Sequence, residues 1–366
     1  MKIYKSRIME RMRILHIIND LEIGGAQRLL ADFLPLMNKQ HNIEVLILRE
    51  KPSPLMQELI DSGIKIHCLK VKSLYNPLTT LRIRRFLKQQ PRYDVIHVHL
   101  FPSLYWVPLA VIGMHQHLVW TEHSTSNRRQ QNPLLRYTDR IAYSRYEKII
   151  CISQATCDSL KDRLGAQSDD HLCVIENGID VNKFKNQKTA ERQHKSLIQI
   201  SRFEASKDQD TVIRAMLLLP KDIHLVFVGD GSRIDICKAL CNTLNLQDRV
   251  HFLGSRTDIA QLLSNADIAI QSSHWEGFGL AAVEAMAAGL PTIASNVEGL
   301  RQVVEGAGLL FPKGDAETLS KLILQILSDS SVYQEISEKC RQRSLLYDIQ
   351  NTANLYVSIY EEVVEE

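Results

Sequence analysis

The sequence predicts an α/β protein with two domains, each built on a doubly wound parallel sheet. Short apolar segments rich in β-branched residues alternate with helical stretches, an order typical of parallel βαβ units. This rhythm breaks over the polar residues 182–195, the best linker candidate, and then starts again. The chain has 366 residues, enough for two hydrophobic cores of ordinary size.

Strands and helices alternate through the first half of the chain. Residues 13–19 predict a strand, and Gly24 and Gly25 predict a turn. Residues 26–37 have the spacing of an amphipathic helix. Short apolar runs predict further strands at residues 43–48, 64–69, 95–98, 119–120 and 149–152.

The longest apolar run covers residues 104–114. Pro108 interrupts it, and it is shorter than the roughly 20 residues of a membrane span. We therefore expect a buried helix there and no transmembrane helix. Residues 1–11 lack the apolar region of a signal peptide and precede the first predicted strand, so Met12 is a candidate start.

The second half repeats the pattern of the first. Apolar runs predict strands at residues 197–200, 225–228, 250–253, 268–270 and 292–294. Residues 280–288 are strongly helical, and so is the final segment, 345–364. We therefore expect Rossmann-like domains at residues 1–181 and 182–344, followed by a C-terminal helix at about 345–366.

The composition is that of a soluble globular protein, with 45% apolar and 23% charged residues. Seven cysteines are scattered singly, which favours a reducing compartment over a disulfide framework. Residues 1–180 carry 25 Lys and Arg against 18 Asp and Glu, whereas the remainder carries 19 against 24. The basic first half suggests that it meets an anionic surface or acceptor.

Glu276 and Glu284 flank a glycine-containing turn and the start of a helical run. A predicted strand ends shortly before Glu276, so this carboxylate should lie at the carboxyl end of a strand. That edge of an open α/β sheet binds anionic ligands, because helix N-termini present free N–H groups there. Gly277 and Gly279 allow a ligand close to the backbone, since they lack a Cβ. The pattern is typical of a sugar-nucleotide site.

Further segments accompany this one in a fixed order along the chain. They are Gly24-Gly25-Ala26-Gln27-Arg28, Asn177-Gly178-Ile179-Asp180, Ser201-Arg202-Phe203 with Lys207, Val228-Gly229-Asp230-Gly231, Phe252-Leu253-Gly254 and residues 285–294. Together they resemble the retaining glycosyltransferases of family 4, which have the GT-B architecture of two Rossmann-like domains facing a cleft. The resemblance extends from about Met12 to the last helix, although Gln27 stands where glutamate is common. It also implies that the C-terminal helix, at about 345–366, crosses back to pack on the first domain.

The resemblance implies which residues bind a nucleoside diphosphate sugar, most simply a UDP- or GDP-sugar, with no other cofactor. Arg202 and Lys207 would grip the diphosphate, as a planar guanidinium and a point charge can. Glu284 would accept both ribose hydroxyls, and Glu276 would face the transferred sugar. The full donor-binding set would be Gly25, Arg202, Lys207, Gly254, Glu276, Gly277, Phe278, Gly279, Leu280 and Glu284.

The first half supplies the remaining candidates. His123 follows a predicted strand, and the family places a histidine there against the donor sugar, near the anomeric carbon. It would complete a catalytic set with Glu276, Arg202 and Lys207. His99, at the end of another strand, and Gly24 are candidates for the acceptor side, although a core or rim role is the simpler interpretation for His99.

Two patterns resemble metal sites, but we expect no metal. Asp208-Gln209-Asp210 matches an acidic triplet that holds a divalent cation in another glycosyltransferase fold. It precedes a predicted helix, which its carboxylates would cap, and nearby cations already offer positive charge to a diphosphate. Cys237 and Cys241 share a helix face but lack a second pair of ligands. Packing is the simpler interpretation for both thiols.

Residues 82–88 combine four cations with Ile83, Phe86 and Leu87 at helical spacing. Two interpretations stay open for this segment: contact with an anionic membrane surface, or an ordinary helix whose apolar side packs on the sheet. The basic patch contains neither interleaved aromatic residues nor a nucleic-acid-binding module, so we expect no nucleic-acid partner.

The predicted function is transfer of a sugar, with retention, onto a saccharide or lipid-linked acceptor in bacterial polysaccharide or cell-envelope glycan biosynthesis. The first domain would bind the acceptor, and the enzyme would work in the cytoplasm, peripherally at the membrane. The alternatives are a GT-B nucleotide-sugar epimerase, which would lack the Arg202, Lys207 and Glu276 pattern, and a non-catalytic sugar-nucleotide-binding subunit. A dinucleotide-dependent oxidoreductase is disfavoured, because the first loop contains no G-x-G-x-x-G.

Overall fold

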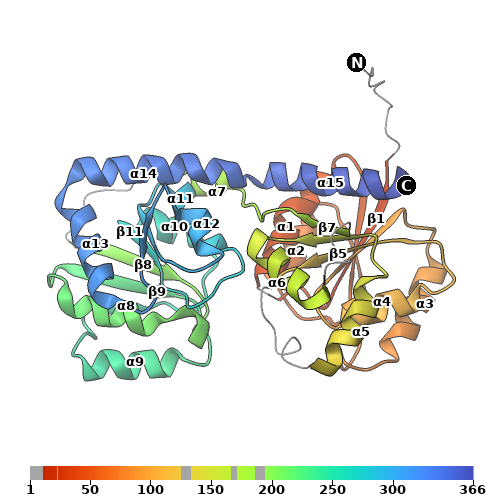
Figure 1. Cartoon of the computed structure of the whole chain (residues 1–366), viewed down its shortest axis with the longest axis horizontal. Coiled ribbons are helices and arrows are strands. Elements are labelled where there is room, and N and C mark those ends of the chain that lie inside the picture. The colour runs from red at the N-terminus through yellow and green to blue at the C-terminus, as the bar shows by residue number, and fades with distance from the viewer. Residues whose placement is uncertain (1–10, 23, 125–132, 166–170, 186–193, 366) are drawn as a thin grey trace, which may run out of the picture. The chain divides into compact units, whose positions relative to one another are not determined.

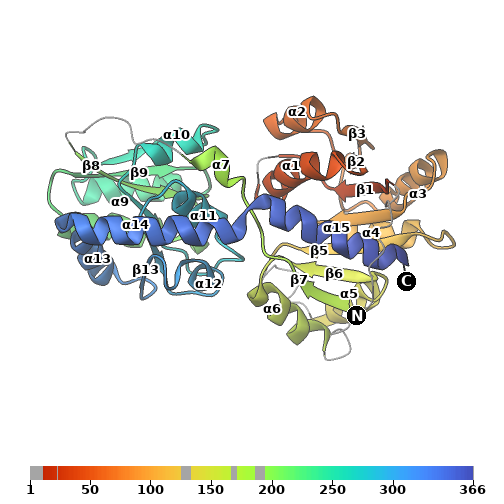
Figure 2. The ribbon, with the colours of Figure 1, turned by 90° about the horizontal axis from the view of Figure 1, so that it is seen from above.

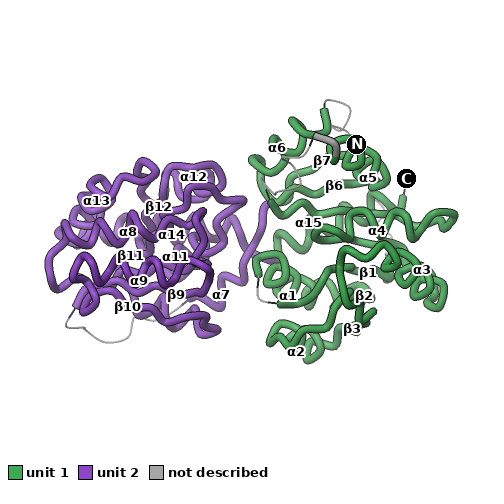
Figure 3. Tube along the Cα trace, turned by 90° about the horizontal axis from the view of Figure 1, so that it is seen from below, with its two compact units in different colours: residues 1–175, 350–366 green, residues 176–349 purple. Residues whose placement is uncertain are grey.

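A computed structural model of the chain describes residues 11–22, 24–124, 133–165, 171–185 and 194–365 (Figure 1). The N-terminal residues 1–10 and most of the predicted linker, residues 186–193, lie outside the described residues. The chain divides into two compact units (Figure 3). Unit 1 comprises Met1–Ile175 together with Gln350–Glu366, and unit 2 comprises Glu176–Ile349.

Unit 1 is built on a parallel sheet of seven strands in the order β3-β2-β1-β4-β5-β6-β7. Its strands are β1 Arg13–Ile18, β2 Asn42–Ile47, β3 Lys65–Cys68, β4 Val95–His99, β5 His117–Glu122, β6 Lys148–Cys151 and β7 Leu172–Val174. The strand order reverses between β1 and β4, the switch point at whose carboxyl edge such sheets bind ligands. The predicted doubly wound sheet is therefore confirmed.

Helices cover both faces of this sheet. Its helices are α1 Gly25–Asn38, α2 Pro54–Asp61, α3 Thr79–Gln89, α4 Ser103–Ala110, α5 Pro133–Tyr143, α6 Gln154–Leu164 and α15 Ile349–Glu365. Buried side chains of α3, α4, α5 and α6 form one core with alternate residues of the strands, such as Ile96 and Val98. Neighbouring strand residues, such as His97, face the other side, where the ring of Phe33 on α1 meets Tyr356 on α15.

The last helix belongs to the first sheet although it follows unit 2 in sequence. Tyr356 and Tyr360 of α15 are fully buried in unit 1, and the Tyr360 hydroxyl lies 2.5 Å from Nδ1 of His97 on β4. Figure 2 shows α15 running beside α1 over the strands of unit 1. The predicted helix of residues 345–364 begins as a short 3₁₀ turn, Leu345–Tyr347, before α15 starts.

Unit 2 contains a parallel sheet of six strands in the order β10-β9-β8-β11-β12-β13. Its strands are β8 Lys195–Ile200, β9 Ile223–Val228, β10 Val250–Phe252, β11 Ile268–Gln271, β12 Thr292–Ser295 and β13 Leu309–Phe311. The short edge strand β13 was not among the predicted strands, because three apolar residues give no usable periodicity. The order reverses between β8 and β11, so the carboxyl edge beside these two strands is the expected ligand site.

Eight α-helices surround this sheet among the described residues. They are α7 Val181–Phe184, α8 Gln209–Ala215, α9 Ile234–Thr243, α10 Ile259–Ser264, α11 Leu280–Ala287, α12 Leu300–Val304, α13 Ala316–Ser328 and α14 Ser330–Ser344. Two 3₁₀ turns, η3 Ala205–Lys207 and η4 Met216–Leu218, precede and follow α8. The fold of each unit therefore places helix N-termini at the carboxyl edge of a parallel sheet.

The expectation of a buried helix at residues 104–114 is wrong in part. Helix α4 ends at Ala110, and only one side of it faces the sheet. Leu104 and Val107 are buried, whereas Leu109 is 51% exposed and Ile112 is 63% exposed. No helix within the described part of the chain has the length and apolarity needed to cross a bilayer.

Candidate active site

Glu276 lies in the loop between β11 and α11, at the carboxyl edge of the second sheet. Its carboxylate forms an ion pair with Lys207 Nζ, and both side chains are largely buried. Ser273 Oγ also lies 3.3 Å from Glu276 Oε2. Lys207 and Glu276 are 69 positions apart in the sequence. The fold therefore brings together two of the residues predicted for the donor side.

Backbone contacts hold the loop that carries Lys207. The hydroxyl of Ser272, directly after β11, lies 2.9 Å from the carbonyl oxygen of Lys207 and 2.8 Å from that of Asp208. Gln199 on β8 donates to the Lys207 carbonyl from 3.1 Å. Sequence reasoning missed Ser272 and Gln199, since polar residues in or just after an apolar strand signal a buried hydrogen bond but not its partner.

Two glycines shape the Glu276 loop. Gly279 precedes the first turn of α11 with a φ of 94°, and a Cβ there would lie 2.6 Å from Leu300 Cδ2. Gly299 has a φ of 83°, and its Cβ would lie 2.4 Å from the carbonyl oxygen of Glu276. Any larger residue at either position would displace the loop. Gly299 was not predicted as part of the site.

Arg202 takes a different position from Lys207. Its side chain is 71% exposed and pairs with Glu204 at 2.9 Å. The guanidinium is therefore free to turn toward an anion, because an exposed ion pair of this kind is worth at most about 1 kcal/mol. The backbone just before Arg202 packs closely against Gly229, since a Cβ on Gly229 would lie 2.1 Å from the Ser201 carbonyl oxygen.

The remaining donor candidates surround α11 and β10. Gly277 is half-buried, Phe278 is buried against Tyr347 with ring centroids 5.3 Å apart, and Leu280 begins α11. Glu284 lies one turn further along α11 and is half-buried. Gly254 follows β10 with a φ of 66° and has open space around its Cα. The first turn of α11 directly follows Gly279, and the first N–H groups of a helix have no partner within it.

In unit 1 the candidates gather at the carboxyl edge of β1, β4 and β5. Gly24 precedes the first turn of α1, and a Cβ there would lie 2.6 Å from Gln27 Oε1, whereas Gly25 has no atom near its Cβ position. His99 ends β4 and is fully buried. His123 directly follows β5 and is partly exposed. The structure thus places all four near one switch point.

Three histidines form a hydrogen-bonded chain that ends at this edge. His16 Nδ1 lies 3.0 Å from His99 Nε2, and His99 Nδ1 lies 3.1 Å from His123 Nε2. Desolvation by burial lowers the pKa of His16 and of His123 to about 3 and the pKa of His99 well below its usual value. All three rings are therefore neutral at physiological pH, and each carries one N–H.

The hydrogen bonds couple the tautomers of His16, His99 and His123, so that the position of the proton on one ring decides its position on the others. If His16 Nδ1 donates to His99, then His99 Nδ1 donates to His123, and His123 carries its proton on Nδ1. In the opposite direction all three rings are protonated on Nε2. The buried His16 Nε2, which has no hydrogen-bond partner within the described part of the chain, then becomes an orphaned donor. Such donors are rare in native proteins. We therefore expect the Nδ1–H tautomer in all three rings.

This expectation can be checked by ¹⁵N NMR on histidine-labelled protein, in which protonated and unprotonated ring nitrogens have separate shifts. A His99→Phe variant should uncouple the other two rings and leave a mixture at His123. Wild-type protein in which His99 and His123 carry different tautomers would contradict the coupling.

Among the described residues, neither metal-like pattern of the sequence has the partners of a cation site. Asp208 accepts a hydrogen bond from Thr211 Oγ1 at 2.7 Å, and Asp210 pairs with Arg233 at 2.9 Å. Asp208 stands at the N-cap of α8, but its side chain makes no capping bond to a backbone N–H, so that detail of the predicted cap is wrong. Burial raises the pKa of the Cys237 thiol to about 12, which keeps it protonated.

The imidazoles of His16, His97 and His99 also lie close enough to consider a metal. Both nitrogens of His97 are already bonded, to Tyr360 and to Thr121 Oγ1 at 2.7 Å. The rings of His97 and His99 stack with centroids 4.2 Å apart, an arrangement that does not converge lone pairs on one point. The cluster is better described as a hydrogen-bonded polar network within the first sheet.

Comparison with protein families agrees with this geometry. The family described as "Glycosyltransferase Family 4" matches residues 23–183, and the family described as "Glycosyl transferases group 1" matches residues 180–343. The two matches adjoin, cover most of the chain and follow the order of its two sheets.

Two similar proteins have names that refer to a sugar group or its transfer. The chain is 26% identical to N-acetyl-alpha-D-glucosaminyl L-malate synthase of Bacillus anthracis, over 76% of this chain and 77% of that protein. It is 26% identical to UDP-Gal:alpha-D-GlcNAc-diphosphoundecaprenol alpha-1,3-galactosyltransferase of Escherichia coli, over 91% and 92%.

Among solved structures, HepE of Anabaena in complex with UDP and glucose superposes with a TM-score of 0.83 at 21% identity, covering 95% of this chain and 99% of HepE. A glycosyltransferase from Rickettsia africae superposes with a TM-score of 0.84 at 19% identity, over 98% and 100%. These likenesses confirm the predicted fold, and the family matches confirm the predicted resemblance. The chain belongs to glycosyltransferase family 4 and has the GT-B fold.

Proposed function

We propose that this glycosyltransferase moves a sugar, with retention, from a nucleoside diphosphate sugar to a saccharide or lipid-linked acceptor in bacterial polysaccharide or cell-envelope glycan biosynthesis. The observation that carries the proposal is the Lys207–Glu276 pair beside the N-terminus of α11. A cation, a sugar-binding carboxylate and free N–H donors then meet at one switch point. The E. coli relative, whose name includes UDP-Gal and diphosphoundecaprenol, supports this kind of donor and acceptor.

In this proposal unit 2 binds the donor. Lys207, Arg202 and the N-terminus of α11 stabilise the negative charge that develops as the diphosphate leaves. Glu276 binds hydroxyls of the transferred sugar, and Glu284 accepts the ribose hydroxyls. No side-chain nucleophile is required, because the leaving phosphate oxygen takes the proton of the acceptor hydroxyl while the acceptor attacks from the same face. The anomeric configuration is then retained.

Unit 1 binds the acceptor and contributes His123 to the transferred sugar. With its proton on Nδ1, the neutral His123 ring donates a hydrogen bond to a sugar or phosphate oxygen without adding a charge. His99 lies behind His123 and holds its Nε2, so His99 acts on the sugar only through His123. Gly25, next to the acceptor candidate Gly24, leaves room for a ligand at the N-terminus of α1.

A donor-hydrolysis screen with UDP-, GDP-, ADP- and dTDP-sugars, in buffer and in excess EDTA, tests this function. We expect slow hydrolysis of a UDP- or GDP-sugar that persists in EDTA, because the cations and the helix N-terminus replace a metal. Hydrolysis lost in EDTA and restored by Mg²⁺ or Mn²⁺ would contradict metal independence. Epimerised donor without free nucleotide would indicate the epimerase, and binding without turnover of any donor, even with candidate acceptors, would indicate a non-catalytic subunit.

We further propose that the enzyme works in the cytoplasm and binds anionic membranes through helix α3. Ile83 and Leu87 are buried in the core of unit 1, so the apolar side of α3 packs on the protein. Arg84 is also engaged, since it donates to the carbonyl oxygens of Ala110 and Ile112 at 2.8 and 2.7 Å. Arg85 and Lys88 are exposed and remain available to lipid head groups.

Vesicle co-sedimentation tests this contact. An Arg85→Glu/Lys88→Glu variant should bind anionic vesicles at least roughly tenfold more weakly than wild type at low salt, since each cation near such a surface contributes about 1 kcal/mol. Binding should disappear at high salt through screening. A Lys221→Glu/Lys313→Glu variant, with the same charge change on exposed residues of unit 2, is the control. Equal sedimentation of all three proteins would remove α3 from the membrane contact.

A further inference from the structure

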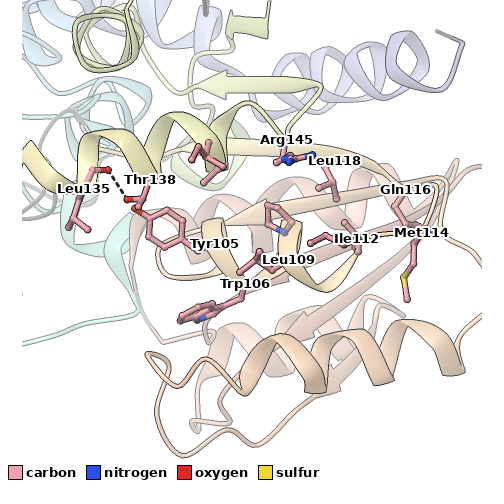
Figure 4. A pocket seen from close by; sticks show the side chains of 15 residues that line it. Tyr105, Trp106, Leu109, Ile112, Met114, Gln116, Leu118, Leu135, Thr138 and Arg145 are labelled. Carbon is pink, nitrogen blue, oxygen red and sulfur yellow. Dashed lines mark hydrogen bonds between the residues drawn. The ribbon is translucent and has the colours of Figure 1, made fainter.

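An open groove of about 630 Å³ lies between α4 and α5 of unit 1 (Figure 4). Its lining is mostly apolar and includes Leu109, Ile112, Met114, Leu118, Leu135 and Ile141. Three of these side chains are exposed to solvent, Ile141 to 45% and the two on or just after α4 by half or more. Apolar side chains gathered around one concave site mark a binding site for an apolar ligand.

The two ends of the groove lie toward opposite edges of the sheet. Helix α4 follows β4 and α5 follows β5, so both helices run from the carboxyl edge of the sheet toward its amino edge. Leu135 lies at the start of α5, and Arg145 lies just after its end. The 11 residues of α5 span about 16 Å. The Leu135 end of the groove therefore lies toward the edge that carries His99 and His123.

The opposite end of the groove is cationic. Arg145 is exposed and contributes to the lining there, and Figure 4 shows it beside Leu118, away from Leu135. Arg84 reaches the same end of α4, where it caps the carbonyl oxygens of Ala110 and Ile112. The exposed guanidinium of Arg145 at this end suits the anionic surface of a membrane.

We propose that this groove binds the hydrocarbon chain of a polyprenyl-linked acceptor. The inference rests on the proposed function, which supplies the lipid-linked class of acceptor. The polar linkage lies at the Leu135 end, so that the attached sugar reaches the carboxyl edge beside His123. The hydrocarbon chain of the acceptor follows the apolar groove along α4 and α5 and leaves it past Arg145 toward the bilayer. The groove thus selects the lipid portion of the acceptor, while the carboxyl edge binds its sugar.

Direct binding of short prenyl phosphates tests the proposal without knowledge of the sugar. Geranyl, farnesyl and geranylgeranyl monophosphate, each kept below its micelle concentration, are titrated while the fluorescence of Trp106, a lining residue, is followed. Each isoprene unit adds several buried methylene-sized groups, so Kd should fall at least roughly tenfold per unit until the groove is filled. A Trp106→Phe variant assigns the signal. Kd values that do not depend on chain length would overturn the proposal.

Matched variants locate the binding. Ile141→Glu places a carboxylate in the lining and should weaken geranylgeranyl monophosphate binding at least roughly tenfold. Tyr137→Glu, at a position that is 71% exposed one turn earlier on α5 and outside the lining, should leave Kd unchanged. Equal effects of both variants would overturn the assignment to the groove. Equal affinity for saturated alkyl phosphates with the same number of carbons would overturn the polyprenyl assignment and indicate a general lipid site.

The result separates from a failure of the proposed function, because donor hydrolysis is measured on the same preparations. Chain-length-dependent binding that is lost in Ile141→Glu supports the groove even if no nucleotide sugar is hydrolysed. Normal hydrolysis with no binding of any prenyl phosphate overturns the groove and leaves the proposed function intact.

Discussion

Replacing Lys207 by alanine is expected to lower kcat/KM by at least roughly 100-fold. The ammonium group provides a charge-assisted contact that strengthens as the diphosphate leaves, and loss of one such group commonly removes several kcal/mol of transition-state stabilisation. The variant also leaves Glu276 without the cation that it contacts in the free protein. Because Arg202 belongs to the same proposed clamp, Arg202→Ala should cause a loss of similar size.

Steady-state kinetics with the donor found in the screen provide the measurement. Lys221→Ala removes an exposed lysine elsewhere in unit 2 and should leave kcat/KM unchanged. A thermal melt excludes unfolding as the cause, since Lys207 is held by its backbone carbonyl to Ser272 and Gln199 and not by its side chain alone. Rates for Lys207→Ala within a factor of three of wild type would remove Lys207 from the diphosphate site.

Acid is expected to destabilise unit 1 strongly through its buried histidines. Desolvation lowers the pKa of His16 from 6.5 to about 3 in the folded state, so an unfolded chain binds a proton at pH 4.5 that the folded chain does not. Stability is therefore lost as the pH falls below 6.5. His16 alone contributes a loss of about 2.5 kcal/mol between pH 7 and pH 4.5. The lowered pKa values of His97 and His99 add in the same direction.

The expected shift is a fall in the Tm of unit 1 by at least about 5 °C between pH 7 and pH 4.5. Fluorescence can follow it, because Trp106 and Trp120 belong to unit 1 and Trp275 belongs to unit 2. His16→Phe keeps a ring at that position but removes the titrating group, so its Tm should depend less steeply on pH. Desolvation raises the pKa of Glu44, but hydrogen bonds from His67, Arg13 and Tyr93 outweigh it and lower this pKa overall. Protonation of Glu44 therefore also destabilises the folded protein in acid, and this contribution is the same in wild type and in His16→Phe. An identical pH dependence in His16→Phe would contradict the histidine explanation.

The sequence was sufficient for most strands of the parallel sheets, because each of those is a local apolar run with a helix after it. The edge strands β7 and β13 have only three residues each and were not predicted. The sequence was also sufficient for placing Glu276 at a strand end, since the strand and the following helix are adjacent in sequence. The hydrogen bond from Ser272 to the Lys207 carbonyl could not be predicted, because it joins residues that only the pairing of β8 with β11 brings together. The histidine chain depends in the same way on the register of β1, β4 and β5.

The exposed side of α4 shows a second limit of prediction from sequence. Periodicity distinguishes apolar residues from polar ones, but Leu109 and Ile112 are apolar and nevertheless face solvent. Nothing in the order of residues distinguishes an apolar side chain that completes a core from one that lines a groove. That distinction depends on the distance between α4 and α5, which the packing of both helices on the sheet decides.

The return of α15 to the first sheet has a consequence for how the protein is made. Unit 1 begins at the N-terminus but includes residues 350–366, and these leave the ribosome only after all of unit 2. At about 5–20 residues per second, roughly 9–35 s pass between synthesis of the two parts of unit 1. During that interval the surface around Phe33 and His97 lacks its contacts with Tyr356 and Tyr360. Unit 2 can therefore finish folding first. Until α15 is made, unit 1 exposes a surface that a chaperone would bind.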